Sequence, residues 1–336
     1  MRVVAIGGGT GLATLLRGLK RHTTDAPPRL KPAIDAITAV VTVTDEGGSS
    51  GRLRREFRVL PPGDIRNCLV ALAGDETLFA KLFNYRFKSG AGLRGHNLGN
   101  LFLTALTNIT RDFATAVRVS SEILAVHGEI FPSTLSDVHL KAKLRDGRTI
   151  YGESRITKTH VPIAKLSIIP ARCKPLPQTL AAIKAADLIT VGPGSLYTSL
   201  VPNFLVEGIA EEIVRSGALK LYIGNLMTQP GESHRYTAAD HLEALHQHAG
   251  HRVFDGMVLN TSPFPPALRK RYASQRAEPV VNDVGRIQAL GVEPIEAQLL
   301  AVDRVARHDP ARLTRLLLDL AVRRKRRHRR KTAGAA

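Results

Sequence analysis

A glycine-rich segment near the start of the chain has the composition of a phosphate-binding loop. The segment GGGTG at residues 7–11 follows the apolar run Val3 to Ile6 and precedes leucines that recur at helical spacing. Glycine lets backbone N–H groups approach phosphate oxygens, and the N-terminus of a following helix stabilises an anion. The loop therefore predicts a phosphate-bearing ligand, with a purely structural tight turn as the alternative. Its candidate contacts are Gly8, Gly9, Thr10 and Gly11.

The same loop argues against NAD. The dinucleotide fingerprint G-x-G-x-x-G would require glycine where this chain has Leu12. An acid that binds the ribose is expected about 20 residues beyond the loop, whereas Asp35 precedes the second apolar run and Asp45 follows it. A nicotinamide-dependent dehydrogenase is therefore disfavoured.

A second loop, TDEGGSSGRLRR at residues 44–55, mixes carboxylates, hydroxyls and guanidinium groups. It follows an apolar run, and open α/β sheets bind their ligands at the carboxyl ends of their strands. Its carboxylates suit a divalent cation or a ribose, and its arginines suit a phosphate. A flexible surface loop of mixed charge is the alternative reading. The candidate ligand contacts here are Asp45, Ser49, Ser50 and Arg52.

A third loop, GPGSLYTS at residues 192–199, again follows an apolar run. Two glycine-rich strand exits in one sheet would place two backbone-lined anion sites at the same edge, which suits a diphosphate or two phosphorylated ligands. A turn stiffened by proline is the structural alternative. The candidate contacts are Gly192, Gly194 and Ser195, together with the polar residues Asn67 and Asn97 beside other apolar runs.

The remaining polar residues give no catalytic motif. His96 suits a cap or a core position better than a general base. The sequence contains neither an HExxH motif nor a Cys/His metal motif, and no Ser/His/Asp arrangement can be argued from spacing. Nucleophilic catalysis is therefore not predicted.

Apolar runs that alternate with helix-compatible stretches must position these loops. The runs end near Ile6, Val43, Val191, Ile223 and Leu259. Continuous apolar strands interleaved with helices are typical of a parallel sheet that is covered on both faces. We therefore predict an α/β, Rossmann-like fold with a mostly parallel sheet, in one domain over residues 1–322.

Two segments depart from this alternation. Helical patterns fill the region from about 64 to 128, with Asp64 as the expected N-cap of the first helix after PPG at 61–63. Alternating residues on both sides of Asp146-Gly147 then predict a β-hairpin over about 138–153. We interpret the first as a helical insertion into the sheet.

The charge is concentrated at the end of the chain. The formal net charge is +19, and RRKRRHRRK at residues 323–331 supplies eight of the positive charges. We expect the last helix to run from about Pro310 to Val322 and residues 323–336 to form a disordered basic tail. Such a tail would contact nucleic acid only non-specifically; a solubilising terminus is the alternative.

Composition predicts a folded cytoplasmic protein. Of the 336 residues, 43% are hydrophobic and 23% are charged, a balance typical of globular proteins. No apolar run approaches the length of a membrane span, and no signal peptide pattern follows Met1. Cys68 and Cys173 lack the spacing of a metal site.

Seven segments, in order along the chain, resemble those of the YvcK-like gluconeogenesis factors, which are relatives of the CofD phospholactyl transferases. They are VVAIGGGTGL at 3–12, TVTDEGGSSGRLR at 42–54, PPGDIRNCL at 61–69, GHNLGNL at 95–101, ITVGPGSLYTSLVPN at 189–203, YIGNLMTQPGES at 222–233, and the region from Asn260 through Tyr272 to Asp309. The arginine-rich tail lies outside this pattern.

The resemblance implies a nucleotide-sugar ligand, expected to be UDP-N-acetylglucosamine, and a non-catalytic role in cell shape and in the regulation of cell-wall precursor supply. It implies that Tyr272 and Arg307 contact the ligand, and it adds an amino-sugar biosynthetic enzyme and a homo-oligomer to the expected partners. By the transferase branch, Asp45 would hold a divalent cation such as Mg²⁺. The alternative function is therefore a magnesium-dependent phospholactyl or nucleotidyl transferase, although the GGSS that follows Glu46 is typical of the factors.

Overall fold

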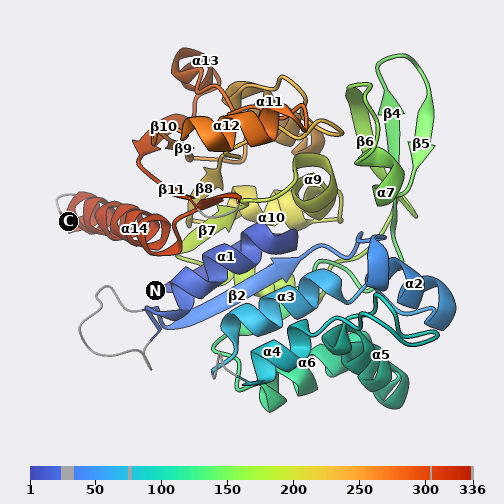
Figure 1. Ribbon diagram of the computed structural model, residues 1–336. Helices are drawn as coiled ribbons and strands as arrows, with labels where there is room; N and C mark the ends of the chain where they lie inside the picture. The colour runs from blue at the N-terminus through green and yellow to red at the C-terminus, as the bar shows by residue number, and fades with distance from the viewer. Residues whose placement is uncertain (24–33, 75–77, 303–304, 334–336) are drawn as a thin grey trace.

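Seven parallel strands form the central sheet of the computed structural model, which describes residues 1–23, 34–74, 78–302 and 305–333 (Figure 1). The strand order is β10-β9-β8-β7-β1-β2-β3, and every neighbouring pair is parallel. The predicted α/β class with a parallel sheet is confirmed. The strands are β1 (Arg2–Gly7), β2 (Ala36–Val41), β3 (Glu129–Pro132), β7 (Leu188–Val191), β8 (Leu219–Ile223), β9 (Gly256–Asn260) and β10 (Glu293–Ala297).

The chain reverses its direction of travel across the sheet between β1 and β7. It passes from β1 outward through β2 to β3, then returns to pair β7 with the other side of β1 and continues outward to β10. Helices therefore leave β1 and β7 toward opposite faces, which opens a crevice at the carboxyl ends of these two strands. Both glycine-rich loops begin there, at residues 7 and 192.

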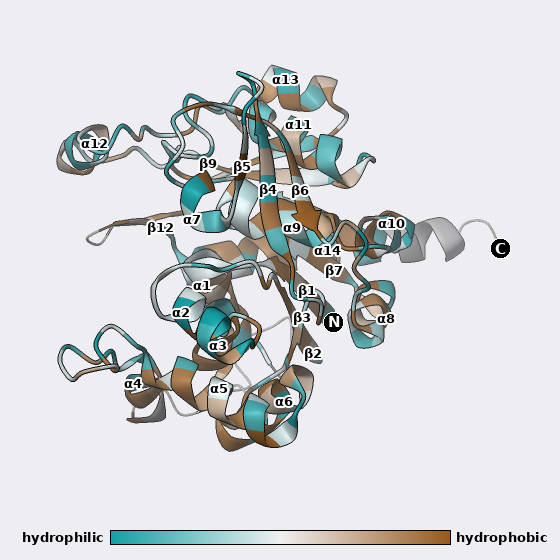
Figure 2. Ribbon diagram, turned by 90° about the vertical axis from the view of Figure 1, so that its right-hand side faces the viewer, coloured by the Kyte–Doolittle hydropathy of each residue, from teal (hydrophilic) through white to brown (hydrophobic). Residues whose placement is uncertain are grey.

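Helices cover both faces because each carries one apolar stripe. In α1 (Gly9–Lys20), Leu12, Leu15, Leu16 and Leu19 are fully buried. This helix packs against α3 (Gly63–Leu72) and α14 (Pro310–Ala333). Figure 2 shows α1, α2 (Gly48–Phe57) and α3 on one side of the strands, with α8 (Pro177–Ala185) and α10 (Ile209–Arg215) on the other.

The helices α3 to α6 occupy the predicted insertion between β2 and β3. After α3 come α4 (Leu78–Asn84), α5 (Leu98–Thr110) and α6 (Phe113–Ile123). The expectation that Asp64 caps α3 is wrong, because Pro62 is the N-cap and Asp64 lies within the first helical turn.

A small antiparallel sheet stands beside the main one. The turn at Asp146 and Gly147 joins β4 (His139–Leu144) to β5 (Thr149–Tyr151), and β6 (Ile163–Ile169) pairs with the other edge of β4. Between β5 and β6, the short helix α7 (Glu153–Ile156) turns toward the crevice.

The last helix is longer than predicted. Instead of ending near Val322, α14 continues to Ala333, so the prediction of disorder from residue 323 is wrong for the helical part. Arg324 pairs with Asp255 at 3.0 Å and Lys325 with Asp187 at 3.1 Å, which ties the first basic turn to the sheet. Residues 334–336 lie outside the described residues. Within the described ranges, no helix has both the length and the hydropathy of a bilayer span.

Candidate functional site

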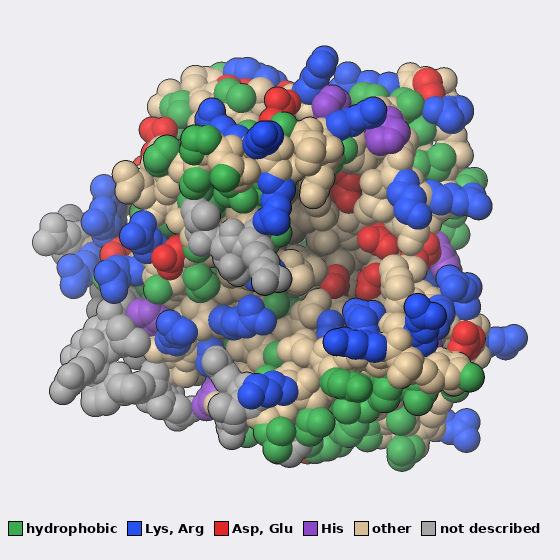
Figure 3. All heavy atoms as spheres, in the orientation of Figure 1, with side chains coloured by type: hydrophobic (Ala, Val, Ile, Leu, Met, Phe, Trp, Pro, Cys, Tyr) green, Lys and Arg blue, Asp and Glu red, His purple; other side chains and the backbone are tan. Residues whose placement is uncertain are grey.

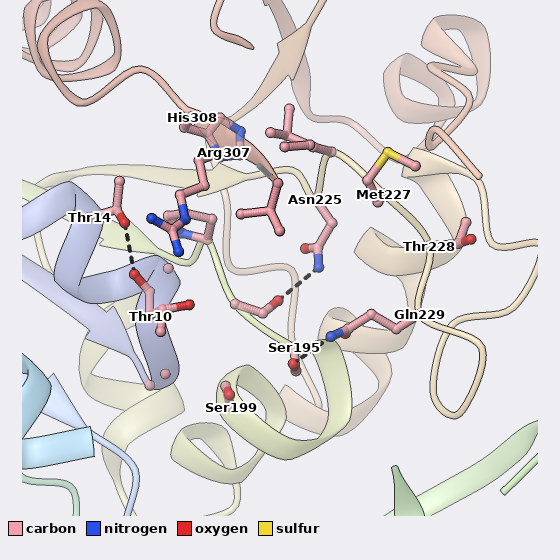
Figure 4. Close-up of a pocket in the computed structure, with 18 of the residues that line it drawn as sticks. Thr10, Thr14, Ser195, Ser199, Asn225, Met227, Thr228, Gln229, Arg307 and His308 are labelled. Atoms are coloured by element: carbon pink, nitrogen blue, oxygen red, sulfur yellow. Dashed lines mark hydrogen bonds between the residues drawn. The ribbon is translucent and has the colours of Figure 1, made fainter. Parts of the chain in front are cut away.

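The two glycine loops touch at the point where β1 and β7 end. A Cβ atom on Gly11 would lie 2.3 Å from the carbonyl oxygen of Pro193, so the loops approach more closely than any side chain allows. Gly9 has φ of +65°, a left-handed conformation that glycine adopts without strain. Asn225, which follows β8, donates a 2.8 Å hydrogen bond to the carbonyl of Gly194 and so holds the loop at residues 192–199 (Figure 4).

The first turn of α1 presents backbone N–H groups to this junction. Gly8 is the N-cap residue in extended conformation, no side chain caps the helix, and its first turn carries no acid. The initial N–H groups of a helix lack partners within the helix and carry a partial positive charge. The end of α1 is therefore suited to hold an anion.

An arginine faces these loops from the opposite wall. The hairpin of β11 (Leu300–Val302) and β12 (Ala306–His308) carries Arg307, whose guanidinium extends toward Thr10 and Thr14 of α1 (Figure 4). Tyr272 of α12 (Pro266–Ala273) supports the hairpin, because its hydroxyl accepts a 3.0 Å hydrogen bond from the backbone N–H of Ala306.

These elements enclose a cavity of about 430 Å³, called here the glycine-loop cavity. Burial lowers the pKa of His308 to about 4, so its ring is neutral at pH 7. Arg307 is therefore the one formally charged side chain among the described lining residues at that pH. They are Gly8, Gly9, Thr10, Gly11, Thr14, Pro193, Gly194, Ser195, Ser199, Asn225, Leu226, Met227, Thr228, Gln229, Tyr272, Val305, Ala306, Arg307 and His308.

A second cavity of about 490 Å³ continues the first and has the opposite character. It shares the two loops with the first cavity and adds four carboxylates and an amide, so we call it the acidic cavity. Figure 3 shows acidic side chains gathered in the hollow at this place. The shared residues are Gly9, Thr10, Ser195, Ser199 and Gln229, and the added carboxylate and amide residues are Asp45, Asp64, Asn67, Glu153 and Glu232.

Two carboxylates of the acidic cavity, Asp64 and Glu153, have raised pKa values. Burial, and then the nearby Asp45 carboxylate, raise the pKa of Asp64 to about 7. The same two causes raise the pKa of Glu153 to about 7. Each carboxylate penalises ionisation of the next, and a bound cation would relieve that repulsion.

Glu232 is held by hydrogen bonds to the backbone and side chain of a neighbouring helical turn. It accepts hydrogen bonds from the backbone N–H groups of Tyr197 and Thr198, at 2.8 and 3.1 Å, and from the Thr198 hydroxyl at 2.7 Å. Although burial raises its pKa, these bonds hold the π-helical turn Leu196–Leu200 that follows the third loop. We therefore assign Glu232 to the support of that loop.

Asp45 and Asp64 are the residues of the acidic cavity that could hold a divalent cation. The Asp45 carboxylate lies against the start of α3, where a Cβ on Gly63 would be 2.5 Å from its Oδ2. Within the described residues, no three His, Cys, Asp or Glu side chains gather as a complete metal site. Mg²⁺ is commonly held by only one or two carboxylates together with phosphate oxygens and water, which matches this pair.

The structure separates the predicted contacts into two groups. Lining the cleft are Gly8, Gly9, Thr10, Gly11, Asp45, Asn67, Gly194, Ser195, Tyr272 and Arg307. The others take supporting positions. Ser49 lies 3.1 Å from a ring nitrogen of His96, Ser50 accepts from Asn100, and Asn97 caps α5.

Two further predicted residues also point elsewhere. The Arg52 guanidinium donates to the carbonyl of Arg94 at 2.9 Å rather than closing over the cleft. Gly192 continues the ladder of the sheet, since its N–H donates to the carbonyl of Ile6 at 2.9 Å.

Sequence reasoning missed Asp64 and Glu153 as cleft residues. The sequence places Asp64 at the start of a helix, where an acid is expected as a cap, and Glu153 at the end of the predicted hairpin. The segment PPGD carried a usable signal, because an acid in the first turn of a helix that follows a ligand-binding loop lies near that loop. Glu153 had no such signal.

Comparison with known proteins agrees with the fold and the motifs. A profile of the family described as "2-phospho-L-lactate transferase CofD" matches residues 3–300. A putative gluconeogenesis factor of Nostoc sp. (strain PCC 7120) is 51% identical over 321 residues, which cover 94% of this chain and 68% of that protein. The gluconeogenesis factor of Bacillus subtilis (strain 168) is 46% identical over 320 residues, which cover 95% and 98%.

A solved structure shares the whole architecture. The crystal structure of protein BH3568 from Bacillus halodurans has a TM-score of 0.89 and 45% sequence identity, and the match covers 94% of this chain and 99% of that one. The motifs, the sheet topology and these similarities agree. This chain belongs to the CofD family, among relatives that are named gluconeogenesis factors.

Proposed function

We propose that the cleft binds a nucleotide sugar, with UDP-N-acetylglucosamine as the ligand. The observation that carries this proposal is the meeting of two glycine loops opposite Arg307 across one cavity. Backbone N–H groups and a guanidinium together suit a diphosphate. The two joined cavities, of about 430 and 490 Å³, supply room on either side for a nucleoside and a sugar.

The physiological role that we propose is regulatory. Relatives of this chain are named gluconeogenesis factors, and a nucleotide sugar that feeds cell-wall synthesis is a suitable signal for a control protein. Binding in the cytoplasm would report the supply of this precursor and adjust an amino-sugar biosynthetic enzyme. Cell shape would then depend on the protein indirectly, through precursor supply.

Calorimetry of the full chain with UDP-N-acetylglucosamine tests the ligand. We expect saturable binding with one site per chain, and an affinity at least about 10-fold lower for Tyr272→Ala, which removes the support of the Arg307 hairpin. The matched variant Tyr272→Phe keeps the ring and loses only the hydrogen bond to Ala306, for which we expect a smaller loss. The absence of heat at millimolar ligand, or binding by Tyr272→Ala that equals wild type, would contradict the proposal.

The acidic cavity favours a second candidate function, a magnesium-dependent transferase of a phosphorus-containing group. The observation is the pair Asp45 and Asp64 beside the glycine loops, in a chain whose family profile is that of a transferase. Mg²⁺ held there would neutralise charge on phosphate oxygens of the ligand. Asn67 is oriented beside this pair, because Arg66 donates a 2.7 Å hydrogen bond to its side-chain oxygen and leaves its NH₂ group to donate.

Asp45→Asn separates the two functions. If the chain transfers a group, product formation with Mg²⁺ and an acceptor should fall by at least about 100-fold in this variant, while circular dichroism stays unchanged. If the chain only binds and regulates, no product forms with either protein, and binding of the nucleotide sugar persists in both. Product formation that is unaffected by Asp45→Asn excludes this transferase mechanism.

A further inference from the structure

Helix α5 is apolar on the side that faces away from the core. Its inner side buries Leu103 and Asn100, as expected for a helix packed on the protein. Its outer side carries Leu101, Ala105 and Ile109, spaced four residues apart, and Ile109 is 76% exposed. A surface helix ordinarily carries polar residues on its outer side, so this side is typical of a helix that is covered on both sides.

Helix α4 extends the same apolar surface. Leu78 and Leu82 lie one turn apart on its outer side and are 64% and 41% exposed. The helices are joined by Phe83 and Phe102, whose ring centroids lie 5.1 Å apart. Figure 3 shows the hydrophobic side chains gathered over α4 and α5 at the lower edge of the molecule. We name this surface the α4–α5 face; its members are Leu78, Leu82, Leu101, Phe102, Ala105 and Ile109.

The α4–α5 face is also nearly free of charge in a strongly basic chain. The formal net charge is +19, yet α5 contains no charged residue and α4 contains only Lys81. Two copies of a chain with this charge repel one another when their basic surfaces face each other. An approach through the α4–α5 face places few like charges opposite each other, so this face suits self-association.

We propose that the α4–α5 face is the interface at which a second copy of this chain docks, with α5 packed against α5 of the partner across a two-fold axis. A two-fold interface brings the same patch of each copy together, so the patch must be self-complementary. An uncharged apolar stripe meets that condition without a matching set of opposite charges. Ala105 at the centre of the stripe permits close approach of the two helices.

The size of the face agrees with this occupant. A helix of 13 residues spans about 20 Å, and packed neighbours lie about 8–10 Å apart. Helix α4 has 7 residues and spans about 10 Å, so the two helices together present about 300 Å², and exposed Tyr85 and Leu93 in the loop after α4 extend the apolar area. A standard dimer buries about 800 Å² per partner, so the face supplies the apolar centre and its surroundings supply the rim.

Sedimentation equilibrium over a range of protein concentrations tests this interface. We expect wild type to have a mass of about 73 kDa at micromolar concentration, twice the 36.5 kDa of one chain. Ile109→Glu and Leu82→Glu should each weaken the dimer by at least about 10-fold, because each places a charge in the apolar centre. The control is Val281→Glu, since Val281 is 63% exposed outside this face, and it should leave the mass unchanged.

Cross-linking keeps the test informative if a glutamate variant fails to fold. Cys68 and Cys173 are both buried, so Ile109→Cys introduces an accessible thiol, and a short bismaleimide should join two copies through it in high yield. Val281→Cys should give little product under the same conditions. A wild-type mass of one chain, including the case in which only a different protein occupies the face, would overturn the proposal. So would a dimer that Ile109→Glu leaves intact, or equal cross-linking at both positions.

Discussion

The two halves of the cleft share a wall but differ in chemistry. In the glycine-loop cavity, backbone N–H groups and Arg307 present positive charge. In the acidic cavity, the pKa values of Asp64 and Glu153 are raised, and the charge of the Asp45 carboxylate contributes to both shifts. The first half is therefore suited to hold an anion directly, whereas the second is suited to hold one through a cation or to bind hydroxyl groups.

The largest expected effect comes from closing the junction of the loops. Gly11→Ala should weaken nucleotide-sugar binding by at least about 100-fold, because the new Cβ would lie 2.3 Å from the Pro193 carbonyl oxygen. Gly217→Ala is the matched control, since a Cβ there meets nothing within 4 Å. Calorimetry on both variants, with circular dichroism as the folding check, makes the comparison. Equal affinities would show that the junction is not the anion site.

Removal of the guanidinium should have the next largest effect. Arg307→Ala is expected to weaken binding of UDP-N-acetylglucosamine by about 10- to 150-fold, the range for a lost hydrogen bond to a charged group. Arg118→Ala, at an exposed arginine of α6 that pairs with Glu122, should have no effect on binding. The two titrations differ only in the variant used. A loss that is the same for both would attribute the effect to net charge rather than to this half of the cleft.

A smaller effect is expected from the acidic half. If Asp64 helps to hold Mg²⁺, added Mg²⁺ should strengthen nucleotide-sugar binding by about 10-fold in wild type and by much less in Asp64→Asn. Titrations with Mg²⁺ and with EDTA, for both proteins, supply the four affinities. A metal effect that persists in Asp64→Asn would place the cation elsewhere.

The last expected effect is on stability and its dependence on pH rather than on ligand affinity. The pKa of Asp64 is about 7 in the folded protein, against an ordinary value of 3.8, so the folded state retains a proton that the unfolded state loses as pH rises from about 4 to about 7. The free energy of unfolding attributable to this group should therefore fall over that range and stay low above it. Urea unfolding in EDTA should show a shallower decline for Asp64→Asn than for wild type. Parallel pH profiles would contradict the assignment.

The glycine loops could be recognised from the sequence, whereas the meeting of three carboxylates in the acidic half could not. Gly9 to Gly11 and Gly194 are local signals, because a glycine-rich turn after an apolar strand defines its own geometry. Asp45, Asp64 and Glu153 come from three separate segments, and their meeting depends on how α3 and α7 pack against the sheet. The spacing of these three residues along the chain does not predict that their carboxylates lie close together.

The same distinction explains the errors in the fold. The basic residues from 323 onward have nothing apolar to bury, which predicts a disordered tail. Arg and Lys are nevertheless good helix formers. Asp255 and Asp187, distant in sequence, pair with Arg324 and Lys325 and extend α14. Local composition predicted the charge correctly, and contacts between distant residues determined the structure.

A crystal structure with UDP-N-acetylglucosamine and Mn²⁺ would test the central claim most directly, since Mn²⁺ scatters anomalously where Mg²⁺ does not. We expect density for the diphosphate between residues 9–11 and 194–195, within hydrogen-bond distance of Arg307, and an anomalous peak between the diphosphate and the Asp45 and Asp64 carboxylates. A diphosphate that lies outside the glycine-loop cavity, or that makes no contact with Arg307, would contradict the account.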